Sequence, residues 1–329
     1  MQPTFLISHL NSGGLITNYS CSSRCRHCLY RCSPEWPNDY IDELTCRQNL
    51  ATAKELGCRS MHIGGGEPVL NRRKLLRVIE LFQEEDVVLD YVETNSSWYK
   101  DHKSACDLLT DLHRRGLDTL LISISPFHNE FIPFDRVNGV IKACKTTGMR
   151  VFLWIDDFYE ELNSRDGSRC YDLQNYDAQY LQKLPQRYWT SPGGRALNFL
   201  GEHLGRIPLA RILRVHAGGC SELEMVDHFH LDLYGNYVPG LCSGLSIRRD
   251  DLGASLDPEV YPMVTLLRKH GIRTFLEMAC KKYDFQPRES YANKCDLCFD
   301  IRRYFVIECG MRTFELQPVY HYVEASSDE

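Results

Sequence analysis

Three cysteines lie close together near the start of the chain, in the run Cys21-Ser-Ser-Arg-Cys25-Arg-His-Cys28. This C-x3-C-x2-C spacing offers three thiolates to one metal group. A cubane iron–sulfur cluster has four irons, so three thiolates leave one iron with an open position. Open positions on metals are where chemistry takes place, whereas closed sites are structural or carry electrons. A zinc site is the alternative, with Cys32 or His27 as fourth ligand.

A glycine-rich segment follows in Met61-His-Ile-Gly-Gly-Gly-Glu-Pro68. Residues 61–63 are typical of a short buried strand. Three glycines after it let the backbone approach a ligand and expose its N–H and C=O groups. Glu67 adds a carboxylate that can hold an ammonium group. A plain strand-to-helix turn is the alternative for the glycines alone.

Together, the cysteine triplet and the Gly-Gly-Glu-Pro segment resemble the radical S-adenosylmethionine (radical SAM) superfamily. In that family, SAM chelates the open iron of a [4Fe–4S] cluster, and an electron cleaves SAM to a 5′-deoxyadenosyl radical that abstracts hydrogen. The resemblance implies an electron donor such as flavodoxin or ferredoxin. It makes Cys21, Cys25 and Cys28 the cluster ligands. It makes the glycine-rich segment part of the SAM site, through Gly64, Gly65, Gly66 and Glu67. His27 departs from the family, which usually has an aromatic residue there.

Composition and charge fit a globular enzyme. The 329 residues are 43% hydrophobic and carry a net charge of −6 with no basic tract, which argues against a nucleic-acid partner. No apolar run is long enough to span a bilayer, and the first residues lack the features of a secretory signal. Fifteen cysteines are then best explained by metal clusters and free thiols in a reducing, cytoplasmic setting.

The first two thirds of the chain alternate strand and helix patterns. Buried, non-alternating strands separated by amphipathic helices predict parallel βα units. The expected strands are residues 15–20, 61–63, 87–92, 119–124 and 150–155, and the expected helices are 42–56, 71–83, 101–115 and 135–147. The pattern alone does not decide between a barrel and a doubly wound sheet. The resemblance implies an α/β partial (βα)6 TIM-like barrel.

Chemistry in βα barrels lies at the carboxyl ends of the strands. Polar residues follow the third, fourth and fifth predicted strands, although such residues also cap helices. The resemblance makes Asn95 and Ser123 SAM contacts. Ser191-Pro-Gly-Gly-Arg195-Ala196 resembles a family segment in which the arginine meets the SAM carboxylate or carries structure, a task that suits its planar fork. The tyrosine-rich stretch 157–190 is expected to be a lid or substrate loop rather than a surface connection.

The last third carries a second cysteine set. Residues 230–238 predict a β-hairpin around Gly235-Asn236, with Cys220 before it and Cys242 after it, and a C-x2-C pair stands at Cys295 and Cys298. This closed set of four resembles the twitch or SPASM-like auxiliary cluster domain of radical SAM enzymes, with a wider glycine-to-cysteine spacing than usual. It implies an auxiliary [4Fe–4S] cluster, with zinc as the alternative. Cys280 and Cys309 are expected to be core cysteines.

These observations predict a radical SAM core at residues 1–217 and a small α+β cluster domain at 218–329. The predicted function is a radical SAM oxidoreductase that modifies a peptide or protein substrate. Dehydrogenation of a small molecule such as a sugar alcohol is the alternative, and a non-catalytic zinc-binding protein is the distant one. No separate N-terminal peptide-recognition segment is visible, so a partner protein or the 157–190 stretch would have to recognise a peptide.

Overall fold

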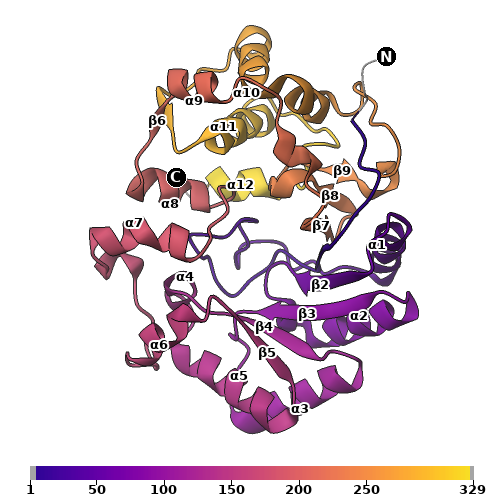
Figure 1. Cartoon of the computed structure of the whole chain (residues 1–329), viewed down its shortest axis with the longest axis vertical. Helices are drawn as coiled ribbons and strands as arrows, with labels where there is room; N and C mark the ends of the chain where they lie inside the picture. Colours follow the sequence, from indigo (N-terminus) through magenta and orange to yellow (C-terminus); the bar gives the residue numbers. More distant parts are fainter. Residues whose placement is uncertain (1–4, 327–329) are drawn as a thin grey trace.

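Six parallel strands, from the edge strand β5 to β7, make up most of the main sheet in the computed structural model, which describes residues 5–326 (Figure 1). The order across the sheet is β5-β4-β3-β2-β1-β7-β8-β9, and β8 and β9 run antiparallel to their neighbours. The strands are β1 Gly13–Ile16, β2 Ser60–Gly64, β3 Val88–Thr94, β4 Thr119–Ser123, β5 Arg150–Trp154, β7 Phe229–Asp232, β8 Asn236–Val238 and β9 Ile247–Arg248. The two remaining strands, β6 (Ile207–Pro208) and β10 (Ser290–Tyr291), pair only with each other in the described chain.

The strand order distinguishes a barrel-like winding from a doubly wound sheet. Strands β1 to β5 lie side by side in chain order, as barrel strands do, whereas a doubly wound sheet reverses its order at a switch point. The predicted α/β fold with a partial, singly wound parallel sheet is therefore confirmed. Its sixth parallel strand is β7, which lies beside β1 rather than beside β5. The short β6 contains Pro208, which lacks an N–H for a sheet ladder.

The helices between the parallel strands begin where the sequence predicts. Asp42, Asn71 and Asp101 each accept a hydrogen bond from a backbone N–H three residues later, which caps the first turn of the helix that follows. Gly148 ends another helix in the left-handed conformation, with φ of 79°. The elements are α1 Glu43–Glu55, α2 Arg72–Glu84, α3 His102–Arg114, α4 Pro126–Asn129 and α5 Phe134–Thr147.

The remainder of the chain is mostly helical and lies above the sheet in the view of Figure 1. The predicted hairpin is present as β7 and β8. These strands follow residue 218, yet they extend the main sheet, so the domain division at 217/218 stays a prediction. The helices are α6 Asp157–Asn163, α7 Ala178–Arg187, α8 Ala196–His203, α9 Leu209–Val215, α10 Pro262–Tyr283, α11 Lys294–Ile307 and α12 Tyr320–Ser326. Among the helices described within residues 5–326, none combines the length and the apolar composition needed to cross a membrane.

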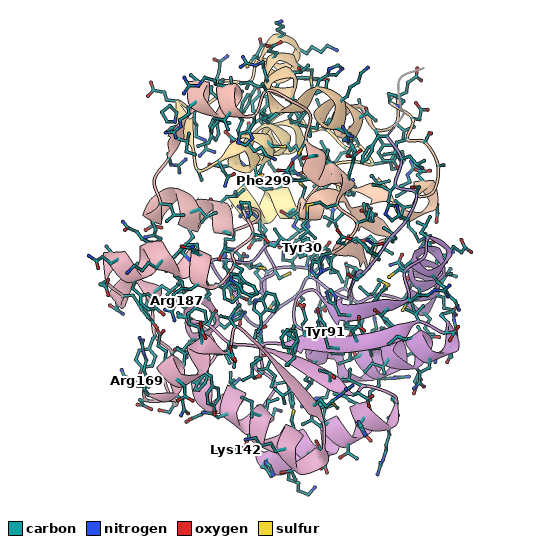
Figure 2. All side chains as sticks on the ribbon, viewed as in Figure 1. Tyr30, Tyr91, Lys142, Arg169, Arg187 and Phe299 are labelled. Carbon is teal, nitrogen blue, oxygen red and sulfur yellow. The ribbon has the colours of Figure 1, made fainter. Side chains whose placement is uncertain are left out.

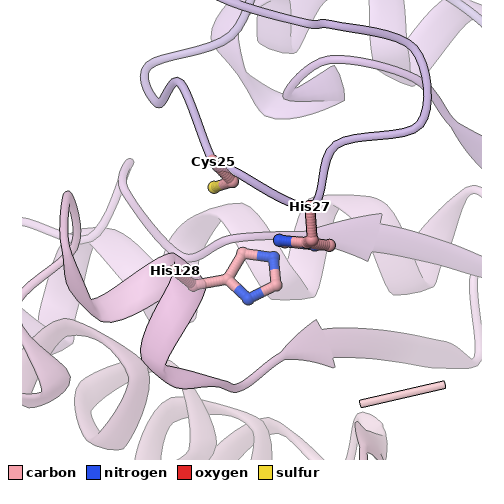
Figure 3. A group of neighbouring side chains, drawn as sticks. All are labelled: Cys25, His27 and His128. Atoms are coloured by element: carbon pink, nitrogen blue, oxygen red, sulfur yellow. The ribbon is translucent and has the colours of Figure 1, made fainter. Parts of the chain in front are cut away.

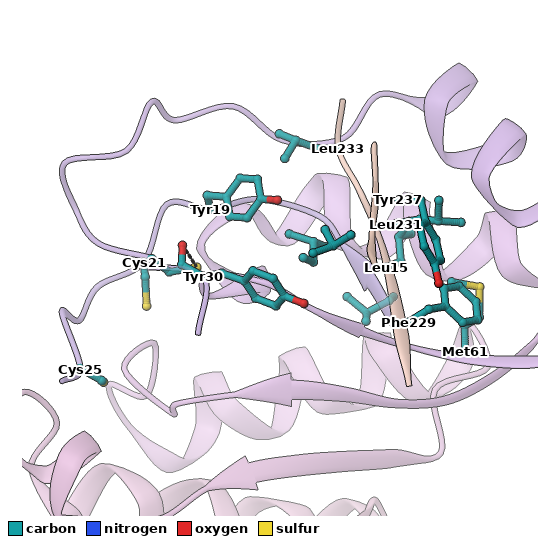
Figure 4. Close-up of a cluster of buried hydrophobic side chains, with 14 of the residues drawn as sticks. Leu15, Tyr19, Cys21, Cys25, Tyr30, Met61, Phe229, Leu231, Leu233 and Tyr237 are labelled. Atoms are coloured by element: carbon teal, nitrogen blue, oxygen red, sulfur yellow. Dashed lines mark hydrogen bonds between the residues drawn. The ribbon is translucent and has the colours of Figure 1, made fainter. Parts of the chain in front are cut away.

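A buried core connects the parallel sheet to the cysteine-bearing segment. Figure 4 shows Tyr19 and Tyr30 beside Cys21, with Leu15 and Leu231 of the neighbouring strands β1 and β7 next to them. Tyr19 and Leu15 are almost completely buried. The Tyr19 hydroxyl donates to the Asp232 carboxylate at 3.0 Å, so the ring buries its apolar surface and satisfies its polar end. The cysteine-bearing segment is thus packed onto the sheet through its aromatic residues.

Glu315 gives a pH-dependent contribution to the stability of this fold. Its buried carboxylate accepts hydrogen bonds from the N–H groups of Met263 and Val264 in the first turn of α10, and burial raises its pKa to about 7. The folded state therefore keeps the proton between pH 4.5 and 7, where the unfolded state loses it. The contribution of Glu315 to the free energy of unfolding is fully present below pH 4.5. It declines as the pH rises to 7, by at most about 1.4 kcal/mol per pH unit.

We therefore expect the difference in unfolding free energy between wild type and Glu315→Gln to fall as the pH rises from 4.5 to 7. Urea unfolding at a series of pH values measures it. A difference that stays constant or grows across this window would contradict the raised pKa. Glu259→Gln, an exposed carboxylate near the start of the same helix, is the matched control.

Candidate active site

The three cysteines of the triplet line one cavity of about 260 Å³. They lie in the cysteine loop, which we define as residues 17–42, between β1 and α1. The cavity is also lined by Gly65, Gly66, Asn95 and Ser123, which stand at or just beyond the carboxyl ends of β2, β3 and β4. The structure thus brings together the predicted cluster ligands and four of the seven predicted SAM contacts. Gly64, Glu67 and Arg195 are not part of its lining.

The glycine loop, residues 64–67, is joined by its backbone to the start of the cysteine loop. The N–H of Gly66 donates to the carbonyl of Asn18 at 2.7 Å, and the N–H of Glu67 donates to the carbonyl of Ser20 at 3.1 Å. A Cβ atom on Gly66 would collide with the Ser20 carbonyl. Gly65 adopts φ of 126°, which favours glycine. The glycines are therefore required for the close approach of two backbones, and this approach exposes Gly65 and Gly66 to the cavity.

The Glu67 carboxylate lies beneath this loop and is completely buried. Its oxygens accept hydrogen bonds from the N–H of Val69 at 3.1 Å, the N–H of Asn95 at 2.7 Å and the hydroxyl of Thr94 at 3.0 Å. Burial raises the pKa of Glu67 to about 7 against the opposing effect of these donors. The predicted contact of Glu67 with an ammonium group stays a prediction. In this structure its carboxylate fixes the glycine loop to the end of β3.

Arg195 is likewise buried, behind the cysteine loop. Its guanidinium donates to the carbonyls of Cys25 at 2.8 Å and Arg31 at 2.8 Å, and its backbone N–H donates to Cys28 O at 2.9 Å. It also pairs with the buried carboxylate of Glu324 from α12 at 2.5 Å. Of the two roles considered for this arginine, these contacts favour the structural one.

Asn95 connects β3 to the cysteine loop. Its side-chain amide donates to the hydroxyl of Ser22 at 3.2 Å and lies 3.5 Å from the sulfur of Cys21. The adjacent Ser96 adopts φ of 66°, so the chain turns sharply after the strand. Asn95 is therefore placed to orient the first cysteine as well as to contact a ligand in the cavity, which Ser123 also reaches from the end of β4.

The thiols of the triplet differ in their acidity. Burial raises the pKa of Cys21 to about 12 and that of Cys25 well above its usual value, whereas hydrogen bonding from Cys32 lowers the pKa of Cys28 to about 6. If Cys21, Cys25 and Cys28 all lose their protons, three negative charges lie close together, and they need a compensating positive charge. A metal group supplies that charge and displaces the protons, which is how thiolate sites bind metals.

His27, the residue that departs from the family pattern, packs against the cavity wall. Figure 3 shows it between Cys25 and His128, and its ring lies 4.7 Å from the His128 ring and 4.4 Å from the Tyr188 ring, centroid to centroid. Burial lowers the pKa of His27 well below its usual value and that of His128 to about 4. Both imidazoles are therefore neutral at neutral pH. An aromatic ring is present at this position, as a histidine.

A second cavity, of about 410 Å³, gathers the second cysteine set. Cys220, Cys242, Cys295 and Cys298 all line it. Asn293 caps the start of α11, where Cys295 and Cys298 stand three positions apart in sequence and so share a helix face. The lining does not include Cys280 or Cys309, both of which lie in the described part of the chain. Four of the predicted ligands, distant in sequence, thus surround one space.

Positive side chains accompany these four thiols. The ammonium of Lys294 lies 3.6 Å from the sulfur of Cys220 and 3.9 Å from that of Cys295, and Arg302 also lines the cavity. Burial raises the pKa of Cys220 to about 12 and also raises those of Cys242 and Cys295. The two cations therefore offset part of the negative charge that four thiolates would carry.

Several residues that line the first cavity were not among the predicted contacts. Tyr188, Trp189 and Thr190 come from the end of the 157–190 stretch, where only the tyrosine-rich composition gave a signal. His228 and His230 reach the cavity because β7 pairs with β1, a long-range pairing that no local pattern indicates. Glu93 follows the rule that strand ends carry chemistry, since it is the penultimate residue of β3.

Removing the Arg195 guanidinium should loosen the cysteine loop. Arg195→Ala removes the donors to the Cys25 and Arg31 carbonyls. It also removes one of the positive charges that pair with the buried Glu324 carboxylate. We expect a loss of about 3 kcal/mol in unfolding free energy, as for other broken buried ion pairs, measured by urea denaturation. Lys103→Ala, which breaks the exposed pair with Asp107, is the control and should cost at most about 0.5 kcal/mol. Equal losses in both variants would contradict this role for Arg195.

Comparison with known proteins finds similar solved structures at low identity. The chain is similar to anSMEcpe with bound AdoMet, at a TM-score of 0.48 and 12% identity over 96% of this chain and 99% of that one. It is also similar to BtrN in complex with AdoMet and 2-DOIA, at 0.44 and 13% over 83% and 91%. A third is Streptococcus suis SuiB bound to S-adenosylmethionine, at 0.39 and 14% over 71% and 61%. No family model and no curated protein matches the chain. At this distance the likeness assigns no family, and the site itself has to carry the functional argument.

Proposed function

We propose that this protein is a radical SAM enzyme whose reaction takes place in the cavity beneath the cysteine loop. The observation that carries the proposal is the shared lining of that cavity. Three thiols in C-x3-C-x2-C spacing, the glycine-loop backbone and the strand-end residues Asn95 and Ser123 all face one space. This is the set that a three-thiolate cluster and a chelated amino acid would need.

Cys21, Cys25 and Cys28 would hold a [4Fe–4S] cluster, and such a cluster would supply the electron for reductive cleavage of SAM and so for hydrogen abstraction from a substrate. The chain's own contribution is to hold and orient these groups. Arg195 fixes the loop that bears the cysteines, and Asn95 lies against Cys21. Gly65 and Gly66 line the cavity without side chains, so a polar ligand such as the methionine portion of SAM can approach their backbone closely.

The second cavity suits a fully ligated auxiliary cluster. Its four thiols make a complete set of four ligands, and closed sites carry electrons or support structure rather than bind substrate. Leu29 and Ser191 line both cavities, so the two cavities are neighbours. An auxiliary cluster there could exchange electrons with the reaction cavity. This arrangement supports net two-electron oxidation as the type of reaction.

A peptide or protein segment is the substrate class that we propose. Strand β5 is the last strand at its edge of the described sheet, so its outer backbone edge is available for an added strand. Trp154 at its end and Trp189 from the 157–190 stretch both line the reaction cavity, and Trp189 is largely exposed. An extended peptide on β5 could therefore reach the cavity past these rings. A small molecule such as a sugar alcohol would make no use of this edge.

Cys21→Ala should abolish SAM cleavage. It removes one of three ligands to the active cluster, and the remaining two thiols cannot hold it in the same state. We expect loss of 5′-deoxyadenosine production by the reconstituted, chemically reduced protein, measured by chromatography. Cys170→Ala, an exposed cysteine outside both cavities, should retain it. Deoxyadenosine production by the Cys21 variant would contradict the ligand assignment, and a colourless wild type without SAM cleavage would favour the zinc-binding alternative.

A Cys295/Cys298→Ala variant should separate the two clusters, because the two thiols left in the second cavity cannot hold a cubane. Each cubane holds four irons, so we expect about eight irons per wild-type chain and about four in the variant, with SAM cleavage retained. Iron and sulfide analysis after anaerobic reconstitution gives the count. The Cys21/Cys25/Cys28→Ala triple variant should also retain about four irons, those of the second site. About four irons in wild type and none in the triple variant would show that the second cavity holds zinc or free thiols.

A further inference from the structure

Three histidines that belong to neither thiol set meet at the wall of the reaction cavity. His62 lies on β2, His230 on β7 and His228 just before β7. Their ring centroids are 5.0 to 5.3 Å apart in all three pairs, and one ring nitrogen of each lies within 4.8 Å of the other two. From these residues we propose a site for a divalent transition metal ion such as Zn²⁺, Co²⁺ or Fe²⁺, held by His62, His228 and His230, with the Glu93 carboxylate beside it.

The sheet register builds this site around a glycine. Gly14 on the central strand β1 pairs with His62 on one side and with His230 on the other. Register partners in a parallel sheet project their side chains to the same face. A Cβ atom on Gly14 would collide with the His62 imidazole and lie 2.7 Å from the His230 ring. The missing side chain therefore opens a gap across which the two imidazoles approach each other.

The spacing of the rings suits a shared ion. Zinc binds imidazole nitrogens at about 2.0–2.1 Å in a tetrahedral arrangement, so imidazoles on one ion have centroids about 5 Å apart. The three measured separations agree with this value. His62 and His230 are more than nine-tenths buried, whereas His228 is exposed, so an ion here would face accessible space.

The hydrogen bonds of the two buried rings leave one nitrogen of each for a metal. His62 makes a hydrogen bond with the backbone of Gly13, while its Nε2 is buried and has no hydrogen-bond partner in the described structure. The Nδ1 of His230 lies 2.8 Å from the Tyr30 hydroxyl. Histidine ligands of metals are usually held in this way, with the second nitrogen fixed by a carbonyl or another polar group. An unpartnered buried nitrogen is costly in the absence of a ligand.

Glu93 places a carboxylate beside His62, outside the group of three imidazoles that lie within 4.8 Å of one another. Its Oε1 lies 3.6 Å from the Nε2 of His62, which is too long for a hydrogen bond. Ligand atoms that share a tetrahedral zinc ion lie about 3.3 Å apart, so the separation is close to that of two ligands. Gly64 makes room for this carboxylate, because a Cβ there would lie 2.8 Å from Oε2. Both glycines that open this space, Gly14 and Gly64, thus border the proposed ion.

The ligand types keep this site chemically distinct from the cysteine sites. Three imidazoles and a carboxylate suit Zn²⁺, Co²⁺ and Fe²⁺ as isolated ions, whereas the thiolate sets suit iron–sulfur clusters. Glu93, His228 and His230 line the reaction cavity. An ion held there would present a Lewis acid to a carbonyl, carboxylate or amine in that cavity.

The test is a titration of the iron- and sulfide-reconstituted protein with Co²⁺. We expect one Co²⁺ per chain, with visible ligand-field bands typical of imidazole and carboxylate ligands and without thiolate-to-cobalt charge transfer. His228→Ala should weaken Co²⁺ binding by more than about tenfold, the least that loss of even an outer partner of a metal ligand usually costs. Because His228 is exposed, this variant should fold, which its melting temperature checks. His270→Ala, an exposed histidine on α10, should bind Co²⁺ as wild type does.

Two outcomes would overturn the proposal. One is equal Co²⁺ affinity in wild type and His228→Ala, and the other is binding with the spectrum of cobalt thiolates only. The Cys21/Cys25/Cys28→Ala variant keeps this test independent of the proposed radical SAM function, because it should retain the histidine-bound Co²⁺ after losing the first cluster. Glu93→Gln gives a second check and should also weaken binding, because it removes a negative charge that lies beside the proposed cation.

Discussion

The contact of Arg195 with Glu324 holds the cysteine loop, and both cavities depend on where that loop lies. Between Thr17 and Asp42 the chain forms no helix or strand beyond isolated bridges, so its backbone carbonyls must find donors elsewhere. Arg195 supplies them, and the buried Glu324 carboxylate compensates its charge. Arg31 of the loop also lies 3.6 Å from that carboxylate. A buried charge left without its partner costs several kcal/mol, so the loop, the Gly-Arg-Ala segment and α12 are ordered together.

This constraint also explains why the two thiol sets are close. The loop lies between the sheet and the C-terminal helices, and Figure 2 labels Tyr30 and Phe299 where these two parts of the chain meet. The Arg31 guanidinium lies 5.0 Å from the centre of the Phe299 ring on α11, the helix that carries Cys295 and Cys298. One face of the loop bears the triplet, and Leu29 within it lines both cavities. The cysteine loop therefore borders both proposed metal sites.

The sequence predicted local features well because their causes are local. Asp42, Asn71 and Asp101 cap helices within three residues of themselves, and strands such as Arg150–Trp154 are short apolar runs. The C-x2-C pair and the cysteine triplet are likewise recognised from the spacing of their cysteines in the sequence. The partners of buried polar groups could not be predicted in this way. Glu67 accepts from Thr94 and Asn95 on another strand, and Arg195 pairs with Glu324 from the last described helix. The resemblance implied a ligand contact for Glu67 and either a ligand contact or a structural role for Arg195. In the fold, the polar atoms of both residues bind backbone groups.

The pairing register of the sheet brings the three histidines together, and this register depends on contacts between strands that are far apart in sequence. Gly14, His62 and His230 come from strands far apart in sequence, and only the pairing of β1 with both β2 and β7 places them in one row. A shift of one residue in the β1–β7 pairing would turn His230 to the opposite face and separate the imidazoles. Tyr91 packs flat against His62 at 4.9 Å and helps to fix that ring. Polar groups are expensive to bury on an inner sheet face unless they are satisfied. The buried His62 Nε2, which has no hydrogen-bond partner in the described structure, and the half-buried Glu93 carboxylate beside it would both be satisfied by the proposed cation.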